Sequence, residues 1–517
     1  MSFVFTFIMV LVIRAFVFET FTIPTGSMAP TLMGQHLEFT CKQCGYTFQA
    51  DALHDPNRRP LPGAICPMCN YPNPLKQATL RSGDRITVIK LPYALSSPKR
   101  WDVVVFKNPQ LKNADNTPGP HHNYIKRLVG LPNESIAFLD GNVYTQPLDP
   151  ETAKPVGPWR IARKSDNLRA QRDLFRPIYH ANYIPFDGGT GSSRNFEQPN
   201  GNRVSFTWKN PWVADVPTAW DMDMTSTYTH TATTKAKLTF DFSRSNKHTV
   251  YNMYPYNQLR PFHPAPEPIE DIRLSLDFTP KNAAGTLTLS TTARWDRTSP
   301  TAPPQILAAI ITPDGRAQLT RTSTNDPADT QVLSQTENIP PLQAGSSAQL
   351  EFWHVDQHLI LWINGKQILT AEYDLPMEQL RTRRGPAPTP NITIQSSAGS
   401  FSIDNLRLDR DLFYASLPSG RKATGGLIRP NANTSVILGK PFPLHRDEFF
   451  CVGDNGPASN DSRLWEDVDP WVDHIYFNDT KRIGVVPRDF MLGRAFYVIM
   501  PAAKHFTPKF QDMRFIH

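Results

Sequence analysis

The stretch Asn123-Tyr-Ile-Lys-Arg-Leu-Val-Gly-Leu-Pro-Asn-Glu134 decides the fold. Lys126 stands among apolar residues in this run, and Gly, Pro and Asn follow it, which is typical of a buried strand. Successive side chains of a strand point to opposite faces, so Lys126 and Arg127 face opposite ways. A lysine removed from water loses its preference for the charged form and can act as a general base near neutral pH. On spacing alone, an ordinary surface lysine remains the alternative.

Short β-branched runs of the same kind occur in three separated parts of the chain. Arg85-Ile-Thr-Val-Ile-Lys90 and Asp102-Val-Val-Val-Phe106 are examples. We predict that these parts form one β domain, which two insertions of different character interrupt. The expected division is a membrane anchor at 1–23, the β domain at 24–36, 79–147 and 440–501, insertions at 37–78 and 148–439, and a C-terminal tail at 502–517.

Length and composition limit the class of protein. A chain of 517 residues is too long for one hydrophobic core, so several folding units are expected. Prolines outnumber glycines by 49 to 27, which argues against a helical bundle and for a mainly β fold. The 54 basic and 47 acidic residues give a formal charge of +7, and such a weak, scattered charge predicts no nucleic-acid partner.

The first residues of the chain are strongly apolar. From Ser2 to Phe18 only small hydroxyl residues and Arg14 interrupt the run. A helix of this length can cross a bilayer if Arg14 and Glu19 lie near one interface, so we predict a retained transmembrane helix over residues 1–23 and a lipid bilayer as partner. The run lacks the leading basic residues and the small-residue site of a cleaved signal peptide. A buried core helix is the alternative.

Four of the five cysteines form two CxxC pairs. They are Cys41-Lys-Gln-Cys44 and Cys66-Pro-Met-Cys69. Two such pairs can give four sulfur ligands to one tetrahedral Zn²⁺, so we predict a zinc-ribbon-like module at 37–78 with a structural zinc ion. A bound metal ion would stabilise this segment, which is too short to form a hydrophobic core of its own. Two disulfides are the alternative if the segment lies outside the cytoplasm.

The larger insertion contains many short runs in which apolar and polar residues alternate. Between about 204 and 412 this pattern predicts an antiparallel β-sandwich, and Asn364-Gly365 marks a two-residue hairpin. The pattern resembles concanavalin-like (laminin-G-like) jelly rolls. Trp353 and Trp362 could stack on sugars if they are exposed, so a glycan or a protein is a candidate partner. Trp residues in alternating positions are more often part of the core.

A loop follows the apolar run: Thr22-Ile-Pro-Thr-Gly-Ser-Met-Ala-Pro-Thr-Leu32. Pro24 restricts its backbone and Gly26 frees it. This combination can hold Ser27 on a sharp, exposed turn where its hydroxyl and its own amide both face a substrate.

Together these motifs resemble type I signal peptidase, the membrane-anchored Ser/Lys endopeptidase of exported proteins. Four motifs occur in the order of that family. They are Pro24-Thr-Gly-Ser-Met-Ala-Pro-Thr31, Arg100-Trp-Asp-Val-Val-Val-Phe106, Tyr124 to Glu134, and Gly453-Asp-Asn455 with Ser459-Asn-Asp-Ser-Arg463. The resemblance implies the signal-peptidase β fold and the removal of N-terminal signal peptides from exported preproteins, with no cofactor for the chemistry.

The resemblance also implies residue roles. Ser27 is the expected nucleophile and Lys126 its general base. The Ser27 amide and the Thr25 hydroxyl are the expected oxyanion donors. Four supporting residues follow from the resemblance. Ser459 orients the lysine amine, and Arg127 belongs to the general-base motif. Asp461 and Arg463 form a buried ion pair, and their i, i+2 spacing would place both on one strand face.

A location follows from the same resemblance. The expected protein crosses the cell (inner) membrane once and holds its catalytic domain on the extracytoplasmic, periplasmic side. Apolar residues after the anchor could then dip into the bilayer surface, namely Phe21, Ile23, Met28 and Leu32, although core packing is the alternative for Met28.

Some positions depart from the family pattern. Trp101 and Asn133 stand where the family usually has Gly, and Gly456-Pro-Ala458 replaces Arg-Asp-Asn. None of these departures removes a proposed catalytic side chain. One alternative function is a membrane-anchored glycan- or protein-binding protein on an inactive peptidase scaffold. Another is a self-cleaving Ser/Lys repressor of the related fold, but that class needs a DNA-binding module and an internal scissile bond, whereas this chain is expected to begin with an anchor.

Overall fold

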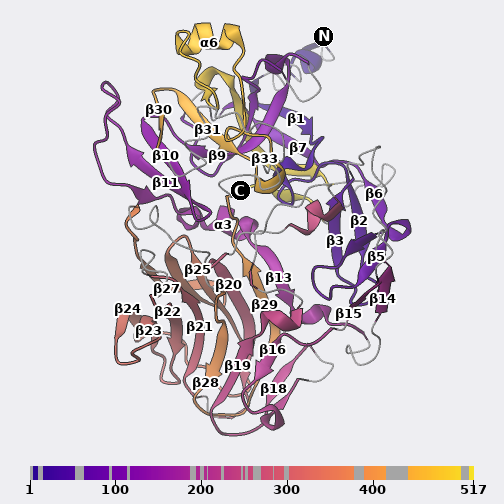
Figure 1. Ribbon diagram of the computed structural model, residues 1–517, viewed down its shortest axis with the longest axis vertical. Helices are drawn as coiled ribbons and strands as arrows, with labels where there is room; N and C mark the ends of the chain where they lie inside the picture. The colour runs from indigo at the N-terminus through magenta and orange to yellow at the C-terminus, as the bar shows by residue number, and fades with distance from the viewer. Residues whose placement is uncertain are drawn as a thin grey trace.

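The computed structural model is mainly β (Figure 1). The sheets of the predicted β domain, called the catalytic unit after the function that the resemblance predicts, lie at the top of this view, the cysteine module at the right and the large β-sandwich below. The described residues are 4–9, 16–52, 63–91, 93, 96–112, 117–186, 194–197, 203–206, 208–222, 226–245, 249–250, 254–259, 269–282, 285–295, 302–377, 389–414, 441–501 and 512–517.

One antiparallel sheet gathers strands from the three separated parts of the chain, as the β-branched runs predict. Its order is β1-β7-β33-β8-β9-β31-β32, with β34 beside β33. The bounds are β1 Phe18–Thr22, β7 Arg85–Ile89, β8 Val103–Lys107, β9 Asn123–Gly130, β31 Glu448–Val452, β32 Val486–Pro487, β33 Met491–Met500 and β34 Arg514–Phe515. In this register Val104 pairs with Lys126 and Val103 with Arg127, so the two basic residues point to opposite faces.

A second, four-stranded sheet packs beside the first. Its order is β12-β11-β10-β30. The bounds are β10 Glu134–Leu139, β11 Asn142–Pro147, β12 Arg160–Ile161 and β30 Phe442–Leu444. A shared core containing Phe106, Phe138 and Phe450 joins the two sheets. Helix α6, Pro470–Phe477, follows the last catalytic motif, and Asp469 caps it by accepting from two backbone N–H groups.

The prediction of a helix to residue 23 is wrong in its last part. Residues 4–9 are helical with exposed apolar side chains, but Phe18–Thr22 is strand β1, which pairs along its whole length with β7. Four of its five residues, Phe18, Thr20, Phe21 and Thr22, are aromatic or β-branched, and such residues favour a strand over a helix. No helix within the described residues has the length and apolarity to cross a bilayer, and residues 1–3 and 10–15 lie outside that description.

The cysteine module consists of two small sheets. One has the order β3-β2-β6 and the other pairs β4 with β5. The bounds are β2 His36–Thr40, β3 Thr47–Asp51, β4 Gly63–Ile65, β5 Pro72–Pro74 and β6 Thr79–Arg81.

The larger insertion contains the predicted sandwich of two antiparallel sheets. One has the order β17-β18-β29-β20-β25-β26-β27, with β13 beside β29, and the other has the order β16-β19-β28-β21-β22-β23-β24. Their bounds are β13 Arg176–His180, β16 Trp212–Ala214, β17 Trp220–Asp221, β18 Tyr228–His230, β19 Ala236–Phe240, β20 Ile272–Pro280, β21 Leu287–Ala293, β22 Gln305–Ile311, β23 Ala317–Ser323, β24 Thr330–Thr336, β25 Ala348–Val355, β26 His358–Ile363, β27 Lys366–Glu372, β28 Thr393–Ser396 and β29 Phe401–Arg410. A short hairpin, β14 Arg194–Glu197 with β15 Arg203–Phe206, lies between β13 and β16 in the chain.

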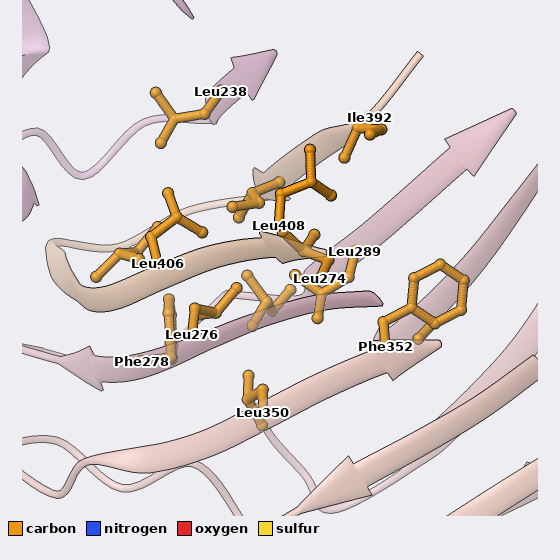
Figure 2. Close-up of a cluster of buried hydrophobic side chains, with 14 of the residues drawn as sticks. Leu238, Leu274, Leu276, Phe278, Leu289, Leu350, Phe352, Ile392, Leu406 and Leu408 are labelled. Atoms are coloured by element: carbon orange, nitrogen blue, oxygen red, sulfur yellow. The ribbon is translucent and has the colours of Figure 1, made fainter. Parts of the chain in front are cut away.

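The alternating apolar residues of both sheets face each other in one core. Figure 2 shows Leu274 from β20 and Leu408 from β29, which belong to one sheet, near Leu289 from β21 of the other sheet. The predicted turn at Asn364-Gly365 is confirmed: both residues have positive φ, 50° and 74°, and they connect β26 to β27.

The hypothesis that Trp353 and Trp362 are exposed for sugar stacking is wrong. They are 0% and 8% exposed. Helix α3, Leu168–Leu174, and the residue that follows it cover the outer face of their sheet, where Phe175 packs against Trp353. The Arg172 guanidinium lies 4.9 and 4.5 Å from the centroids of the two indole rings. The two residues are therefore core, and they offer no surface to a glycan.

The expected domain borders differ from the sheets in several places. Arg160–Ile161, in the insertion, extends the four-stranded catalytic sheet as β12, and Tyr414 bridges to Gly141 of the same region. Arg514–Phe515, in the expected tail, pairs with β33. The insertion and the tail therefore add backbone to the catalytic unit.

Candidate active site

Ser27 lies in a short 3-10 turn, η1 (Gly26–Met28), after strand β1. Asp84 closes the loop that carries this turn. Its carbonyl oxygen accepts from Ile23 N at 2.8 Å and its carboxylate accepts from Met33 N at 2.9 Å. Both ends of the loop are therefore fixed to one residue, which holds the turn at the end of the catalytic sheet.

Lys126 reaches Ser27 from strand β9. Its Nζ lies 2.6 Å from Ser27 Oγ, which is hydrogen-bond distance. The two side chains are buried, with Lys126 4% and Ser27 9% exposed. The structure thus brings together the two residues on which the sequence interpretation depends, although 99 positions separate them.

Burial changes the acid–base behaviour of Lys126. Loss of water lowers the pKa of its ammonium group to about 8, because a charged amine is costly in an apolar site. The carboxylate of Asp461 opposes this shift, since a nearby negative charge favours the protonated amine. A substantial fraction of the lysine is therefore neutral near pH 8, and the neutral amine can accept a proton from the adjacent hydroxyl.

Thr25 precedes the η1 turn in an extended conformation. Its side chain is exposed and makes no capping hydrogen bond to the turn. The hydroxyl and the Ser27 amide belong to the same short stretch, so this part of the loop carries both predicted oxyanion donors.

Asp461 and Arg463 form an ion pair behind the lysine. Two charge-assisted hydrogen bonds, 2.9 and 2.8 Å long, join them, and both side chains are fully buried. Burial alone would raise the pKa of Asp461, but the Arg463 guanidinium lowers it below its usual range. The idea that these residues share a strand face is wrong, since 461–464 is a turn. Close spacing in that turn lets the guanidinium fold back onto the carboxylate.

Ser459 does not make the hydrogen bond that the resemblance implies. Its side chain is 2% exposed and its hydroxyl makes no hydrogen bond to Lys126; it faces the Asp461 carboxylate instead, where it helps to lower the pKa of that group. It lies beside Gly453, where an added Cβ would be 2.2 Å from Ser459 Oγ and 2.4 Å from Ser27 O. Gly453 therefore lets the last motif approach the serine loop closely.

The structure contains a second buried ion pair that the sequence did not predict. Arg127 donates two hydrogen bonds of 2.8 Å to the carboxylate of Asp454, and both side chains are 0% exposed. Thr31 donates to the same carboxylate at 2.6 Å, and Arg127 also donates to Trp101 O at 2.6 Å. Asp454 stands within the last motif, but nothing in its spacing identifies Arg127 as its partner.

Two departures from the family pattern fall on unusual backbone. Trp101 has φ of 74° and Asn133 has φ of 61°. Positive φ favours glycine, which explains why the family usually has Gly there. Trp101 is held in this conformation by its surroundings: the indole N–H donates to Arg163 O at 3.0 Å, and the side chain is 2% exposed. Asn tolerates positive φ better than most residues.

The prediction that residues after the anchor dip into a bilayer is wrong for most of them. Ile23, Met28 and Leu32 are 3%, 0% and 0% exposed and pack in one hydrophobic cluster, with the partly buried Phe21 at its edge. Their side chains hold the serine loop against the sheet instead.

The four paired cysteines lie together, and all are buried free thiols. The Sγ atoms of Cys41 and Cys69 are 3.6 Å apart, as are those of Cys44 and Cys66, and all four lie within 4.8 Å of one another. A tetrahedron of zinc–sulfur bonds about 2.3 Å long has edges of about 3.8 Å, so the spacing fits this metal and is too long for disulfides. The fifth cysteine, Cys451, is buried on β31.

Comparison with known proteins gives a partial match to one family. The family model described as signal peptidase, peptidase S26, matches residues 68–183, which include Lys126 but not Ser27. Signal peptidase I of Rickettsia felis is 31% identical over 144 residues, covering 28% of this chain and 40% of that protein. Probable signal peptidase I-2 of Synechocystis is 36% identical over 73 residues, covering 14% of this chain and 32% of that protein. This chain thus spans well under half the length of these relatives.

Solved structures give only a distant likeness. A carbohydrate-binding module, CBM66 from Bacillus subtilis, is 8% identical, with a TM-score of 0.23, and covers 39% of this chain and 96% of the module. A β-glucanase of Bacillus licheniformis is 10% identical, with a TM-score of 0.24, and covers 43% and 99%.

Proposed function

We propose that this chain is a serine endopeptidase that removes signal peptides from exported preproteins with a Ser27/Lys126 dyad. One observation carries the proposal: a buried lysine amine lies 2.6 Å from the hydroxyl of a serine in a tight turn. The partial similarity to signal peptidases supports this substrate class. The intact dyad favours an enzyme over an inactive scaffold.

The geometry supports a two-step acyl transfer. Neutral Lys126 takes the proton from Ser27 Oγ as that oxygen attacks the carbonyl carbon of the substrate peptide. The Ser27 amide and the Thr25 hydroxyl stabilise the charge on the carbonyl oxygen. The tetrahedral intermediate then collapses, Lys126 gives its proton to the leaving amine, and an ester links the signal peptide to Ser27. Attack of water on this ester, with Lys126 again as base, releases the signal peptide and restores the serine.

The proposed site of action is the outer face of a membrane. The exposed, apolar helical residues 4–9 precede β1 by a short segment and support attachment of the chain to a bilayer. In the proposed arrangement the chain crosses the membrane once, and the catalytic unit lies on the extracytoplasmic side, where exported preproteins emerge.

Cleavage of a purified preprotein tests the proposal. The full chain in detergent should cleave the preprotein at one peptide bond, and the residues just before that bond should have small side chains. The value of kcat/KM should rise about tenfold per pH unit below the pKa of Lys126 and level off above about pH 8, because only the neutral amine accepts the proton.

A preprotein with a bulky residue immediately before the cut serves as the control substrate and should stay intact. Absence of cleavage, or a rate that does not change between about pH 6 and pH 9, would contradict the proposal.

We also propose that Cys41, Cys44, Cys66 and Cys69 hold a structural Zn²⁺. Backbone turns present both pairs alike: Gly45 N donates to Cys41 O at 2.8 Å, and Asn70 N donates to Cys66 O at 2.9 Å. Gly45 and Asn70 both have positive φ, 75° and 60°, which brings the two sulfurs of each pair to the same side. The ion takes no part in the proposed acyl transfer.

Metal analysis under reducing conditions checks the zinc proposal. The purified chain should contain about one equivalent of zinc, and Cys44→Ser should lose most of it, because three thiolates bind zinc less tightly than four. Cys451→Ser is the matched control, since Cys451 is equally buried but is not part of the cluster, and it should keep its zinc. Less than about half an equivalent in the unmodified chain would exclude the site.

A further inference from the structure

A segment of the large insertion packs against the turn that carries Ser27. This segment is η8, Pro255–Leu259. The ring of Tyr256 lies so close to Gly26 that a Cβ on that glycine would be 2.3 Å from Tyr256 Cε1. Tyr254 and Tyr256 are 5% and 3% exposed and belong to the core of the catalytic unit. The insertion therefore builds one wall of the serine loop.

A pair of buried amides connects the segment to the loop. Asn257 and Asn455 donate to each other, at 2.7 and 2.9 Å. Asn455 also donates from its side chain to Gly26 O at 2.9 Å and from its backbone to Ser27 O at 3.0 Å. A carbonyl oxygen only accepts, so Gly26 fixes which end of the Asn455 amide is the NH₂ group, and this in turn fixes the orientation of Asn257.

The next residue of the segment contacts the cysteine module. Gln258 Oε1 accepts from Ile65 N at 2.6 Å, and its Nε2 donates to Ile65 O at 3.2 Å. Ile65 directly precedes Cys66. Adjacent side chains of one segment thus hold the serine loop and the cysteine module together.

We propose that Asn257 is a positioning residue for the nucleophile, supplied by the insertion. This inference rests on the proposed peptidase function. Asn257 fixes Asn455, and Asn455 fixes both carbonyl groups around Ser27, so the Ser27 hydroxyl stays at hydrogen-bond distance from Lys126. The contacts made by Gln258 keep the segment, and with it Asn257, in place.

Kinetics of Asn257→Ala in the full chain test the proposal. The value of kcat should fall by about 10- to 100-fold while KM stays nearly unchanged, because Asn257 contacts the loop rather than the substrate. The double variant with Asn455→Ala should be no slower than Asn455→Ala alone, since both residues act through one contact. Asn257→Asp keeps the oxygen that accepts from Asn455, and its kcat should lie between those of the wild type and the alanine variant.

Asn182→Ala is the matched control. Asn182 donates to Asn405 Oδ1 at 2.8 Å in an amide pair of the sandwich, and this variant should retain wild-type kcat. A wild-type kcat in Asn257→Ala, with Ser27→Ala inactive, would overturn the positioning role alone. Cleavage by Ser27→Ala would overturn the peptidase function and the positioning role with it. Thermal melting of each variant identifies losses of activity that come from unfolding. If Asn257→Ala unfolds, the kcat of Asn257→Asp decides whether Asn257 positions the serine loop.

Discussion

Ser27→Ala, Lys126→Ala and Lys126→Arg should each reduce kcat for preprotein cleavage on the order of 10⁴-fold or more. Alanine at 27 removes the attacking oxygen, and alanine at 126 removes the base that lies 2.6 Å from it. Arginine keeps a positive charge but cannot release its proton near neutral pH, so size and charge alone should not rescue the reaction. Single-turnover kinetics on the purified variants measure these losses.

The double variant Ser27→Ala/Lys126→Ala should be no slower than either single variant, because the two residues act as one unit. Lys90→Ala is a suitable control: Lys90 pairs with Glu19 on the same sheet but is partly exposed. Its activity should be that of the wild type. Full activity in any of the three dyad variants would show that this pair does not perform the chemistry.

Asp454→Ala should destabilise the catalytic unit more than any surface substitution. It leaves the guanidinium of Arg127 buried without its carboxylate, and losing one partner of such a pair costs about 3–5 kcal/mol. The melting transition of the catalytic unit should fall by roughly 10 °C in scanning calorimetry. Asp454→Asn keeps hydrogen-bonding atoms near the guanidinium, so its shift should be smaller.

Asp314→Ala provides the comparison for this prediction. Asp314 pairs with Arg316 at 2.6 Å, but the two side chains are 53% and 55% exposed. Exposed pairs contribute about 0–1 kcal/mol, so the melting temperature should change little. Equal shifts in the two variants would mean that burial of Arg127 and Asp454 is not what makes their pair important.

Several strands of the catalytic sheet were predictable because local patterns determine them, whereas β1 was predicted as the end of a helix. The β-branched runs around Val104 and Lys126 form β8 and β9, and the alternating runs of the insertion form the sandwich. The two CxxC pairs indicated a cluster for the same reason, since each pair forms one local turn. The contact between Ser27 and Lys126 is different. Its 99-residue separation lies beyond any local pattern, and only the family resemblance suggested it.

Contacts between distant parts of the chain were missed. Alternation marked Trp353 and Trp362 as residues of sandwich strands, but it could not show that α3 covers the face on which both lie. Tyr254 to Gln258 carry no strand or helix period, so nothing in the sequence connected them with Ser27. Asp454 was noticed as part of a motif, but its role depends on Arg127, which reaches it across the sheet.

The second place of attachment between the sandwich and the catalytic unit has a mechanical consequence. The insertion joins that unit near β12 and Tyr414, and it touches it again at Pro255–Leu259. A domain tethered at one place can swing about its hinge, whereas a second attachment removes that rotation. The outer surface of the sandwich consequently keeps one constant distance and angle to Ser27 and Lys126.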